Sequence, residues 1–241
     1  MVVVKNQYFG DTRDLFKYDL VLELLLKNDF LKRFTFIPML TENVRNFHGR
    51  RINYDQARAG TRRKELCSFL AQCVMESRRN IIGLERFFKS FKWARKIDFT
   101  IYRKNEYFSH EARTRYFNEI DRCLLSGSAI LVDPDIGLAV KSMGGREDNY
   151  ITYSEVELLF NRMDRNSVLV IFQFIPRVER ESYFSQIGRK LKTIVNSSVL
   201  YISDSQIAFF ILTKNDPKVQ RRVVNTIAEY GKAYGLTIGK V

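Results

Sequence analysis

The chain has 241 residues, with 40 Lys or Arg and 27 Asp or Glu, so its formal net charge is +13. This length suits one α/β domain of roughly 200–250 residues, and the wealth of Phe and Tyr argues against a disordered chain. No apolar run approaches the roughly 20 residues that span a bilayer. The apolar stretch at the N-terminus is interrupted by a charged residue, Lys5, and is too short for a signal peptide. We therefore expect a single domain, residues 1–241, in the cytoplasm.

The excess of basic residues is the most informative property of the composition. A strongly basic protein concentrates polyanions around itself and captures them faster. Nucleic acid is the partner that we favour. An acidic protein or membrane surface, or no polyanion at all, remain the alternatives.

The cysteines and histidines argue against a structural metal site. Cys67, Cys73 and Cys123 form no CxxC pair, and only His48 and His110 could join them. We therefore expect no zinc site and interpret all three cysteines as small buried side chains in a reducing compartment.

Hydrophobic spacing predicts a helix at the start of the chain and strands on either side of a long helical region. The expected elements are, in chain order, a helix over 14–31, a strand over 34–40, a loop over 41–61, a helical region over 62–93 that breaks near Gly83, a strand over 97–102, a helix over 110–125 and a strand over 128–132.

The second half of the chain alternates between helices and strands. Its expected elements are a helix over 153–163 with Ser154 as N-cap, a buried strand over 167–174, a helix over 179–195, a hairpin of 199–202 with 207–212, and a last helix that opens at Asp216-Pro217. This alternation predicts an α/β fold with a Rossmann-like, mostly parallel sheet and helices on both faces. A helical insertion at about 55–95 follows the first strand, and the C-terminal hairpin is antiparallel.

The sharpest local motif is Asp133-Pro134-Asp135, at the end of an apolar strand. Ligands of open α/β sheets bind beyond the carboxyl ends of the strands, so both acids are candidate catalytic residues. Two nearby carboxylates could bind a divalent metal, or one could hold a substrate amine. The alternative is that the motif only terminates the strand.

A second motif, from Tyr8 to Tyr18, places polar and aromatic residues just before the first helix. The start of a helix favours an anion, and Lys17 stands one turn inside this helix among apolar neighbours. If the motif lines a site, replacing Lys17 with Met should weaken ligand binding and leave the melting temperature nearly unchanged. The alternative is a helix start with Lys17 reaching out to solvent.

Arginines gather in and just after the loop over 41–61. The planar guanidinium pairs with two phosphate oxygens at once, which suits contact with a nucleic-acid backbone. The residues that we assign to nucleic-acid binding are Arg50, Arg51, Arg62 and Arg63.

The segment Tyr8-Phe9-Gly10-Asp11, with Asp14-Leu-Phe-Lys17-Tyr18, resembles the N-terminal Gly-Asn…Asp-Val-Leu-Lys-His segment of the large-subunit rRNA adenine-N6 methyltransferases. It is also similar to the three-Cys-motif partner proteins of mobile elements, which would suggest a role in a mobile element or in defence. The resemblance implies a Rossmann-like S-adenosylmethionine methyltransferase fold, in which a strand ending in Asp-Pro-Pro-Tyr or a relative holds the target adenine amine. Asp133 would face that amine. The residues implied for the cofactor site are Tyr8, Gly10, Asp11, Asp14, Lys17 and Glu42.

The chain departs from that pattern in two places. The turn after the first strand, which is normally rich in glycine, reads Leu40-Thr-Glu42-Asn43-Val44, and Asp135 with Ile136 replaces the Pro-Tyr pair. We therefore predict a divergent methyltransferase-like enzyme that uses S-adenosylmethionine on a base in DNA or RNA.

Two alternatives stay open. One is a metal-dependent nuclease in which Asp133 and Asp135 share Mg²⁺, with Gln173 and Arg177 on and after the next strand and with Glu155 as a further acid. The other is a non-catalytic nucleic-acid or partner-binding module of the same fold. The sequence indicates no oligomeric state.

Overall fold

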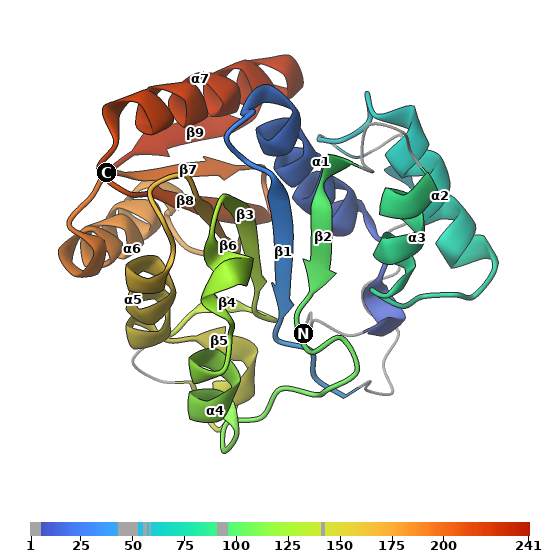
Figure 1. Ribbon diagram of the computed structural model, residues 1–241, viewed down its shortest axis with the longest axis horizontal. Helices are drawn as coiled ribbons and strands as arrows, with labels where there is room; N and C mark the ends of the chain where they lie inside the picture. The colour runs from blue at the N-terminus through green and yellow to red at the C-terminus, as the bar shows by residue number, and fades with distance from the viewer. Residues whose placement is uncertain (1–5, 43–52, 55–56, 58, 91–95, 141–142) are drawn as a thin grey trace.

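The computed structural model describes residues 6–42, 53–54, 57, 59–90, 96–140 and 143–241. A seven-stranded sheet in the order β2-β1-β3-β6-β8-β7-β9 forms its centre (Figure 1). The strands are β1 (Arg33–Pro38), β2 (Asp98–Ile101), β3 (Ser128–Asp133), β6 (Val168–Phe174), β7 (Val199–Ser203), β8 (Ile207–Thr213) and β9 (Thr237–Lys240), and a separate two-stranded ladder joins β4 (Gly137–Leu138) to β5 (Tyr150–Ile151).

The direction of the strands confirms the predicted sheet. β1 pairs in parallel with β2 and β3, and β3 pairs in parallel with β6. β8 runs antiparallel to both β6 and β7, so β7 has the same direction as β6. The carboxyl ends of β1, β3 and β6 therefore share one edge of the sheet with the turn that joins β7 to β8.

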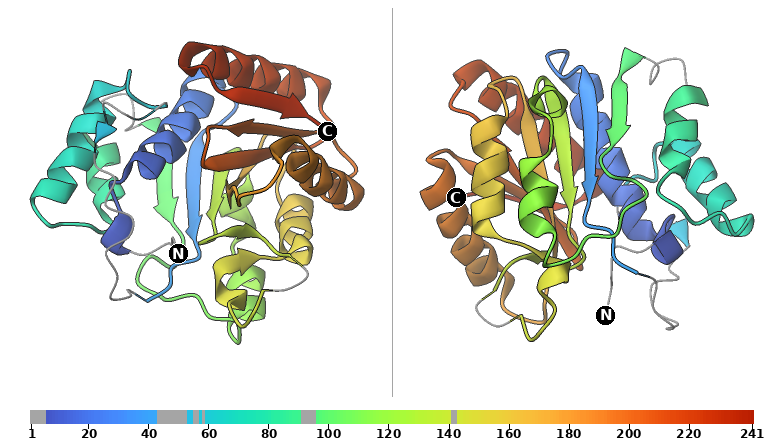
Figure 2. Two further views of the ribbon diagram at one scale, coloured as in Figure 1. Left: turned by 180° about the vertical axis from the view of Figure 1, so that it is seen from behind. Right: turned by 60° about the horizontal axis from the view of Figure 1, so that its bottom comes forward.

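Helices cover both faces of the sheet, as predicted. They are α1 (Thr12–Lys27), α2 (Lys64–Met75), α3 (Gly83–Ser90), α4 (Arg113–Asn118), α5 (Tyr153–Arg162), α6 (Arg180–Val195) and α7 (Pro217–Tyr234). Side chains of α1, α2, α3 and α7 form one buried cluster with the sheet, and side chains of α4, α5 and α6 form a second cluster on the other face. Figure 2 shows helices on both sides of the sheet. β3 and β6 contribute alternate residues to both clusters, which explains their continuous apolar sequences.

The helical insertion lies between β1 and β2, where α2 and α3 stand at the right of Figure 1. The predicted break in the helical region is confirmed: α2 ends at Met75, and α3 begins at Gly83. Much of the predicted loop over 41–61, and part of the predicted insertion, lies outside the described residues.

Three predicted helix boundaries are wrong. α1 ends at Lys27 rather than near residue 31, because Asn28 adopts an extended conformation. The segment over 110–125 is a six-residue helix, α4, followed by a separate 3-10 turn, Arg122–Leu125, which Asp121 caps. Thr152, and not Ser154, caps α5, since its side chain and that of Glu155 form a reciprocal capping box.

Several smaller features were not predicted or were predicted wrongly. The strand β9 was not predicted. It lies at the edge of the sheet and most of its residues are exposed, so its sequence lacks the apolar alternation of a buried strand. Cys73 is buried as expected, but Cys67 is half-buried and Cys123 is exposed. Among the described residues, no helix is both long and apolar enough to cross a membrane.

Candidate functional site

The N-terminal motif folds into a tightly capped helix start. The Asp11 side chain accepts hydrogen bonds from the backbone N–H groups of Arg13 and Asp14, at 2.9 and 3.0 Å. The N–H of Gly10 donates to Oδ2 of Asp14 at 2.9 Å. Gly10 has a φ of 90°, and a Cβ there would lie 2.9 Å from the Val74 side chain, so only glycine fits this turn. The motif thus fixes the direction of the Asp14 carboxylate.

Lys17 joins this helix start to the end of β3. Its Nζ lies 2.9 Å from Oδ1 of Asp14 and 2.6 Å from Oδ2 of Asp133. The side chains of Lys17 and Asp133 are only 7% and 2% exposed, so the interpretation of Lys17 as a lysine that reaches out to solvent is wrong. The structure brings together two motifs that are 116 residues apart. We call Asp11, Asp14, Lys17 and Asp133 the acidic cluster.

The protonation states in the acidic cluster follow from burial and from the ion pairs. Burial raises the pKa of Asp133 to about 6, against the opposing charge of Lys17. Burial, followed by the charge of Asp14, raises the pKa of Asp11 to about 7. Burial alone would lower the pKa of Lys17, but Asp133 and Asp14 together raise it above its ordinary value. At neutral pH Lys17 is therefore a cation and Asp133 is mostly a carboxylate.

Asp133 offers a hydrogen-bond acceptor that the described residues do not use. Oδ2 binds Lys17, whereas Oδ1 is buried and has no hydrogen-bond partner within the described part of the chain. A buried carboxylate oxygen that accepts no hydrogen bond lowers the stability of the folded protein, and such oxygens are rare. A ligand N–H group placed at Oδ1 would remove that cost.

The segment after Asp133 is fixed firmly against β6. Asp135 is 1% exposed, and Gln173 accepts a hydrogen bond from the N–H of Leu138 at 2.8 Å. Gly137 has a φ of 139°, and a Cβ there would lie 2.3 Å from Oε1 of Gln173. The Gln173 amide also donates to the Tyr183 hydroxyl at 2.8 Å. Gln173 therefore has a structural role here.

Of the other residues predicted for the cofactor site, Tyr8 and Gly10 precede Asp11 in the sequence and Glu42 lies between Lys17 and Asp133. Tyr8 is buried at the end of a 3-10 turn, Asn6–Tyr8, two residues before Gly10. Glu42 is exposed, four residues beyond the end of β1. Sequence reasoning did not select Tyr54, whose hydroxyl donates to the Gly10 carbonyl at 2.5 Å. No spacing pattern in the sequence links Tyr54 to this turn.

The predicted nucleic-acid-binding arginines divide into two groups. Arg50 and Arg51 lie outside the described residues. Arg62 donates to the Ala233 carbonyl at 2.7 Å, and Arg63 binds Asp19 at 2.6 Å. Both line a cavity of about 360 Å³ between α1, α7 and the start of α2. They connect the insertion to α1 and α7, and their role in nucleic-acid binding stays a prediction.

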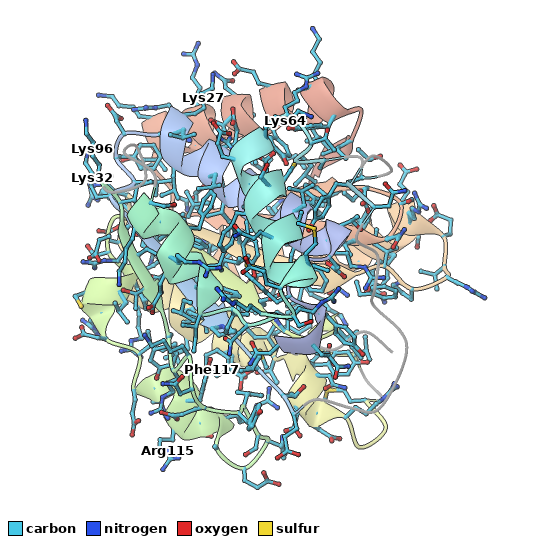
Figure 3. All side chains as sticks on the ribbon, turned by 90° about the vertical axis from the view of Figure 1, so that its right-hand side faces the viewer. Lys27, Lys32, Lys64, Lys96, Arg115 and Phe117 are labelled. Atoms are coloured by element: carbon cyan, nitrogen blue, oxygen red, sulfur yellow. The ribbon has the colours of Figure 1, made fainter. Side chains whose placement is uncertain are left out.

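Exposed basic residues occur in several parts of the surface. Figure 3 shows Lys27, Lys32, Lys64 and Lys96 in the upper part of the molecule, and Arg115 at the lower end. Lys27 ends α1 and Lys32 precedes β1, so both lie near the amino end of that strand. The positive charge is therefore spread over the surface.

A metal site was not predicted at the histidines and cysteines. Within the described ranges, no group of three or more His, Cys, Asp or Glu residues is arranged to hold a metal ion. At Asp133, the Lys17 ammonium already contacts one carboxylate oxygen. A divalent cation at that carboxylate would lie beside a fixed positive charge, which is unfavourable.

No protein-family model matches the chain, and no curated protein matches it. The resemblance to methyltransferases therefore depends on the short motifs at residues 8–18 and 133–135 and on the order of the elements.

Proposed function

We propose that the chain is a methyltransferase-like enzyme that acts on the exocyclic amine of a base in DNA or RNA. The observation that carries this proposal is the state of Asp133, at the carboxyl end of β3. One of its oxygens is held by Lys17, and the other is buried without a hydrogen-bond donor among the described residues. An amine N–H group is the donor that would complete this carboxylate.

Each residue of the acidic cluster has a distinct part in that proposal. Asp133 accepts a hydrogen bond from the amine and so fixes the direction of the nitrogen lone pair. Lys17 keeps Asp133 ionised in spite of its burial, because it lies 2.6 Å from the carboxylate. Asp14 accepts hydrogen bonds from the Gly10 N–H and from the Lys17 ammonium. These two contacts fix the position of Lys17. The amine is thereby oriented before transfer, and the proton that the nitrogen loses on methylation passes to the Asp133 carboxylate.

The charge of the acidic cluster also suits S-adenosylmethionine. Asp14 and Asp133 contact the one Lys17 ammonium, and Asp11, with its pKa raised to about 7, is a partly ionised acid close to Asp14. Such a group of acids attracts sulfonium and ammonium groups. Asp11 and Asp14, with Tyr8, Gly10 and Glu42, are the residues that would hold the cofactor. When bound, the cofactor would supply the methyl group.

The net charge of +13 supports a polyanionic substrate, since it concentrates nucleic acid around the protein. The geometry favours amine recognition over the nuclease alternative. Lys17 contacts the carboxylate that the metal would need, and Gln173 is engaged with the backbone of Leu138.

The direct test is transfer of a radiolabelled methyl group from S-adenosylmethionine to mixed DNA and RNA. Asp133→Asn keeps the shape of the side chain, and Lys17 retains its contact with Asp14. We expect transfer to slow on the order of 100-fold, as for loss of one preorganised hydrogen bond at a reacting group, with cofactor affinity largely preserved. The matched control is Asp29→Asn, at an exposed carboxylate beyond the far end of α1, which should transfer at the parental rate.

The Asp135→Asn variant distinguishes the mechanisms. If Asp133→Asn and Asp135→Asn both abolish Mg²⁺ binding and nucleic-acid cleavage in a parent that cleaves, the nuclease alternative is correct. If neither variant changes any activity or ligand affinity of the parent, Asp133-Pro134-Asp135 only terminates β3.

A further inference from the structure

Arg13 and Lys17 stand one turn apart on the face of α1 that covers β6. Nζ of Lys17 lies 5.2 Å from the centroid of the Phe172 ring, and Cζ of Arg13 lies 5.5 Å from that of the Phe174 ring. Phe172 and Phe174 are two residues apart on β6 and so project from the same face. The two cations thus follow the strand toward its carboxyl end, each against one aromatic ring.

The two cations differ in how they are neutralised. Lys17 contacts two carboxylates, whereas no carboxylate of the described residues lies within 4.0 Å of the Arg13 guanidinium. The two acids nearest in the sequence bind other groups: Asp14 accepts hydrogen bonds from Lys17 and the Gly10 N–H, and Asp11 accepts them from backbone N–H groups. Nε and Nη1 of Arg13 are buried without a hydrogen-bond partner among the residues that the structure describes, and Nη2 makes one long contact of 3.4 Å, to Oε1 of Gln206. Most of the five N–H donors of this guanidinium therefore have no hydrogen-bond acceptor among the described residues.

Arg13 lies at the edge of the sheet where the acidic cluster is found. Phe174 ends β6, and Gln206 belongs to the turn between β7 and β8. Val132 pairs with Ile171, so Asp133 is level with Phe172. Phe174 is two residues further along, roughly 7 Å beyond the level of Asp133. A group bound by Arg13 would thus be a close neighbour of a group bound by Asp133.

The donor pattern of Arg13 fits an oxyanion with several oxygens. A guanidinium binds phosphate through two parallel N–H···O bonds, and its planar face stacks on an aromatic ring. Arg177 and Arg180 are further exposed guanidinium groups between β6 and the first turn of α6, where Glu179 and Glu181 balance their charge.

We propose that Arg13, backed by Phe174, binds the phosphodiester next to the base whose amine is received by Asp133. The inference rests on the proposed function, to which it adds the contact that positions the nucleic-acid backbone. The Arg13 contact is independent of base identity and supports affinity, whereas Asp133 selects the amine. The carboxylate of S-adenosylmethionine is the other oxyanion that the same chemistry could receive, and the test separates the two.

The experiment compares the full-length parent with Arg13→Gln, Arg13→Lys and the control Arg221→Gln. Arg221 is exposed on α7 beside Arg222, which binds Asp29 beyond the far end of α1, so its loss removes one charge at a distance. Binding of a fluorescent single strand and of a duplex is measured by anisotropy at several KCl concentrations. Calorimetry with S-adenosylmethionine and melting curves are recorded for each variant.

We expect Arg13→Gln to bind nucleic acid about tenfold more weakly at moderate salt, as for loss of one charged hydrogen-bonded contact. The slope of log affinity against log salt should fall by roughly 0.7–0.9, the value for one phosphate contact. Arg13→Lys should restore most of the slope but only part of the affinity. An ammonium keeps the charge, but it cannot donate two parallel hydrogen bonds to a phosphate or stack its plane on the Phe174 ring. Arg221→Gln should keep the parental slope.

Parental affinity and slope in Arg13→Gln would overturn the inference. So would parental nucleic-acid binding combined with weakened S-adenosylmethionine binding, which would assign the oxyanion to the cofactor. A parent that binds no nucleic acid would overturn this inference and the proposed function together. If Arg13→Gln lowers the slope but the parent transfers no methyl group, the Arg13 contact stands and the proposed function fails.

Discussion

Replacing Lys17 with Met removes the one cation between two buried carboxylates. The Lys17 ammonium contacts Asp14 at 2.9 Å and Asp133 at 2.6 Å, with its side chain only 7% exposed. Loss of one partner from a buried ion pair typically destabilises a protein by about 3–5 kcal/mol, because the remaining charge stays buried and uncompensated. We expect Lys17→Met to lose about this much unfolding free energy at pH 8.

The loss should depend on pH with a defined sign. In the parent, the pKa of Asp133 rises on folding from its ordinary value of 3.8 to about 6. The folded state therefore holds an extra proton between these values, and this group makes stability fall as the pH rises through that window. Without the ammonium, the folded-state pKa of Asp133 rises further and the window extends to higher pH. The deficit of Lys17→Met should thus be smaller at pH 5 than at pH 8.

The assay is urea unfolding of the parent, Lys17→Met, Asp133→Asn and the double variant at pH 5, 6.5 and 8. Removing both charges should cost less than the sum of the single losses, with a coupling of about 2–3 kcal/mol at pH 8. A Lys17→Met variant within about 0.5 kcal/mol of the parent at pH 8 would refute this reasoning, since that is the range of ordinary surface substitutions. A loss that does not change with pH would refute it equally.

Two further substitutions test the supports of the site, both by urea unfolding. Gly137→Ala should lose more than about 2 kcal/mol, since its φ is 139° and its Cβ would lie 2.3 Å from a side-chain oxygen of β6. Gly144→Ala, also at positive φ but with no atom within 4 Å of its Cβ, should lose about 1 kcal/mol, and equal losses would contradict the proposed clash. Arg63→Met should lose about 3 kcal/mol because Asp19 stays buried without its cation. The exposed Arg62, changed in the same way, should lose less than about 1 kcal/mol, and the reverse order would contradict the proposed role of the pair.

The layered architecture could be predicted because its signals are strong and local. The run over 167–174 is apolar at every position except Ser167 and Gln173, and β6 is indeed buried on both faces. Asp133 could be placed at the carboxyl edge of the sheet, because that edge follows from strand direction alone. β9 could not be predicted in the same way, since an exposed edge strand lacks the apolar alternation that identifies buried strands.

The contacts within the site needed three-dimensional information. Sequence spacing placed Lys17 on α1, but its burial depends on Asp133, which is 116 residues away. The expectation that Lys17→Met would leave stability nearly unchanged is therefore replaced by a large expected loss. Arg13 lies inside the motif that the sequence singled out, yet nothing in its spacing indicates that Nε and Nη1 lack acceptors. Unpaired donors become visible only when all neighbouring elements are in place.

The central claim is that the acidic cluster forms part of a site for S-adenosylmethionine, and calorimetric titration of the full chain tests it most directly. The account predicts that S-adenosylmethionine binds, that Asp14→Asn weakens this binding, and that Asp29→Asn, at an exposed carboxylate beyond the far end of α1, leaves it unchanged. Titration with Mg²⁺ or Mn²⁺ should give no binding at Asp133. Absence of S-adenosylmethionine binding would contradict the account: binding of the metal alone would support the nuclease alternative, and binding of neither would favour the non-catalytic module.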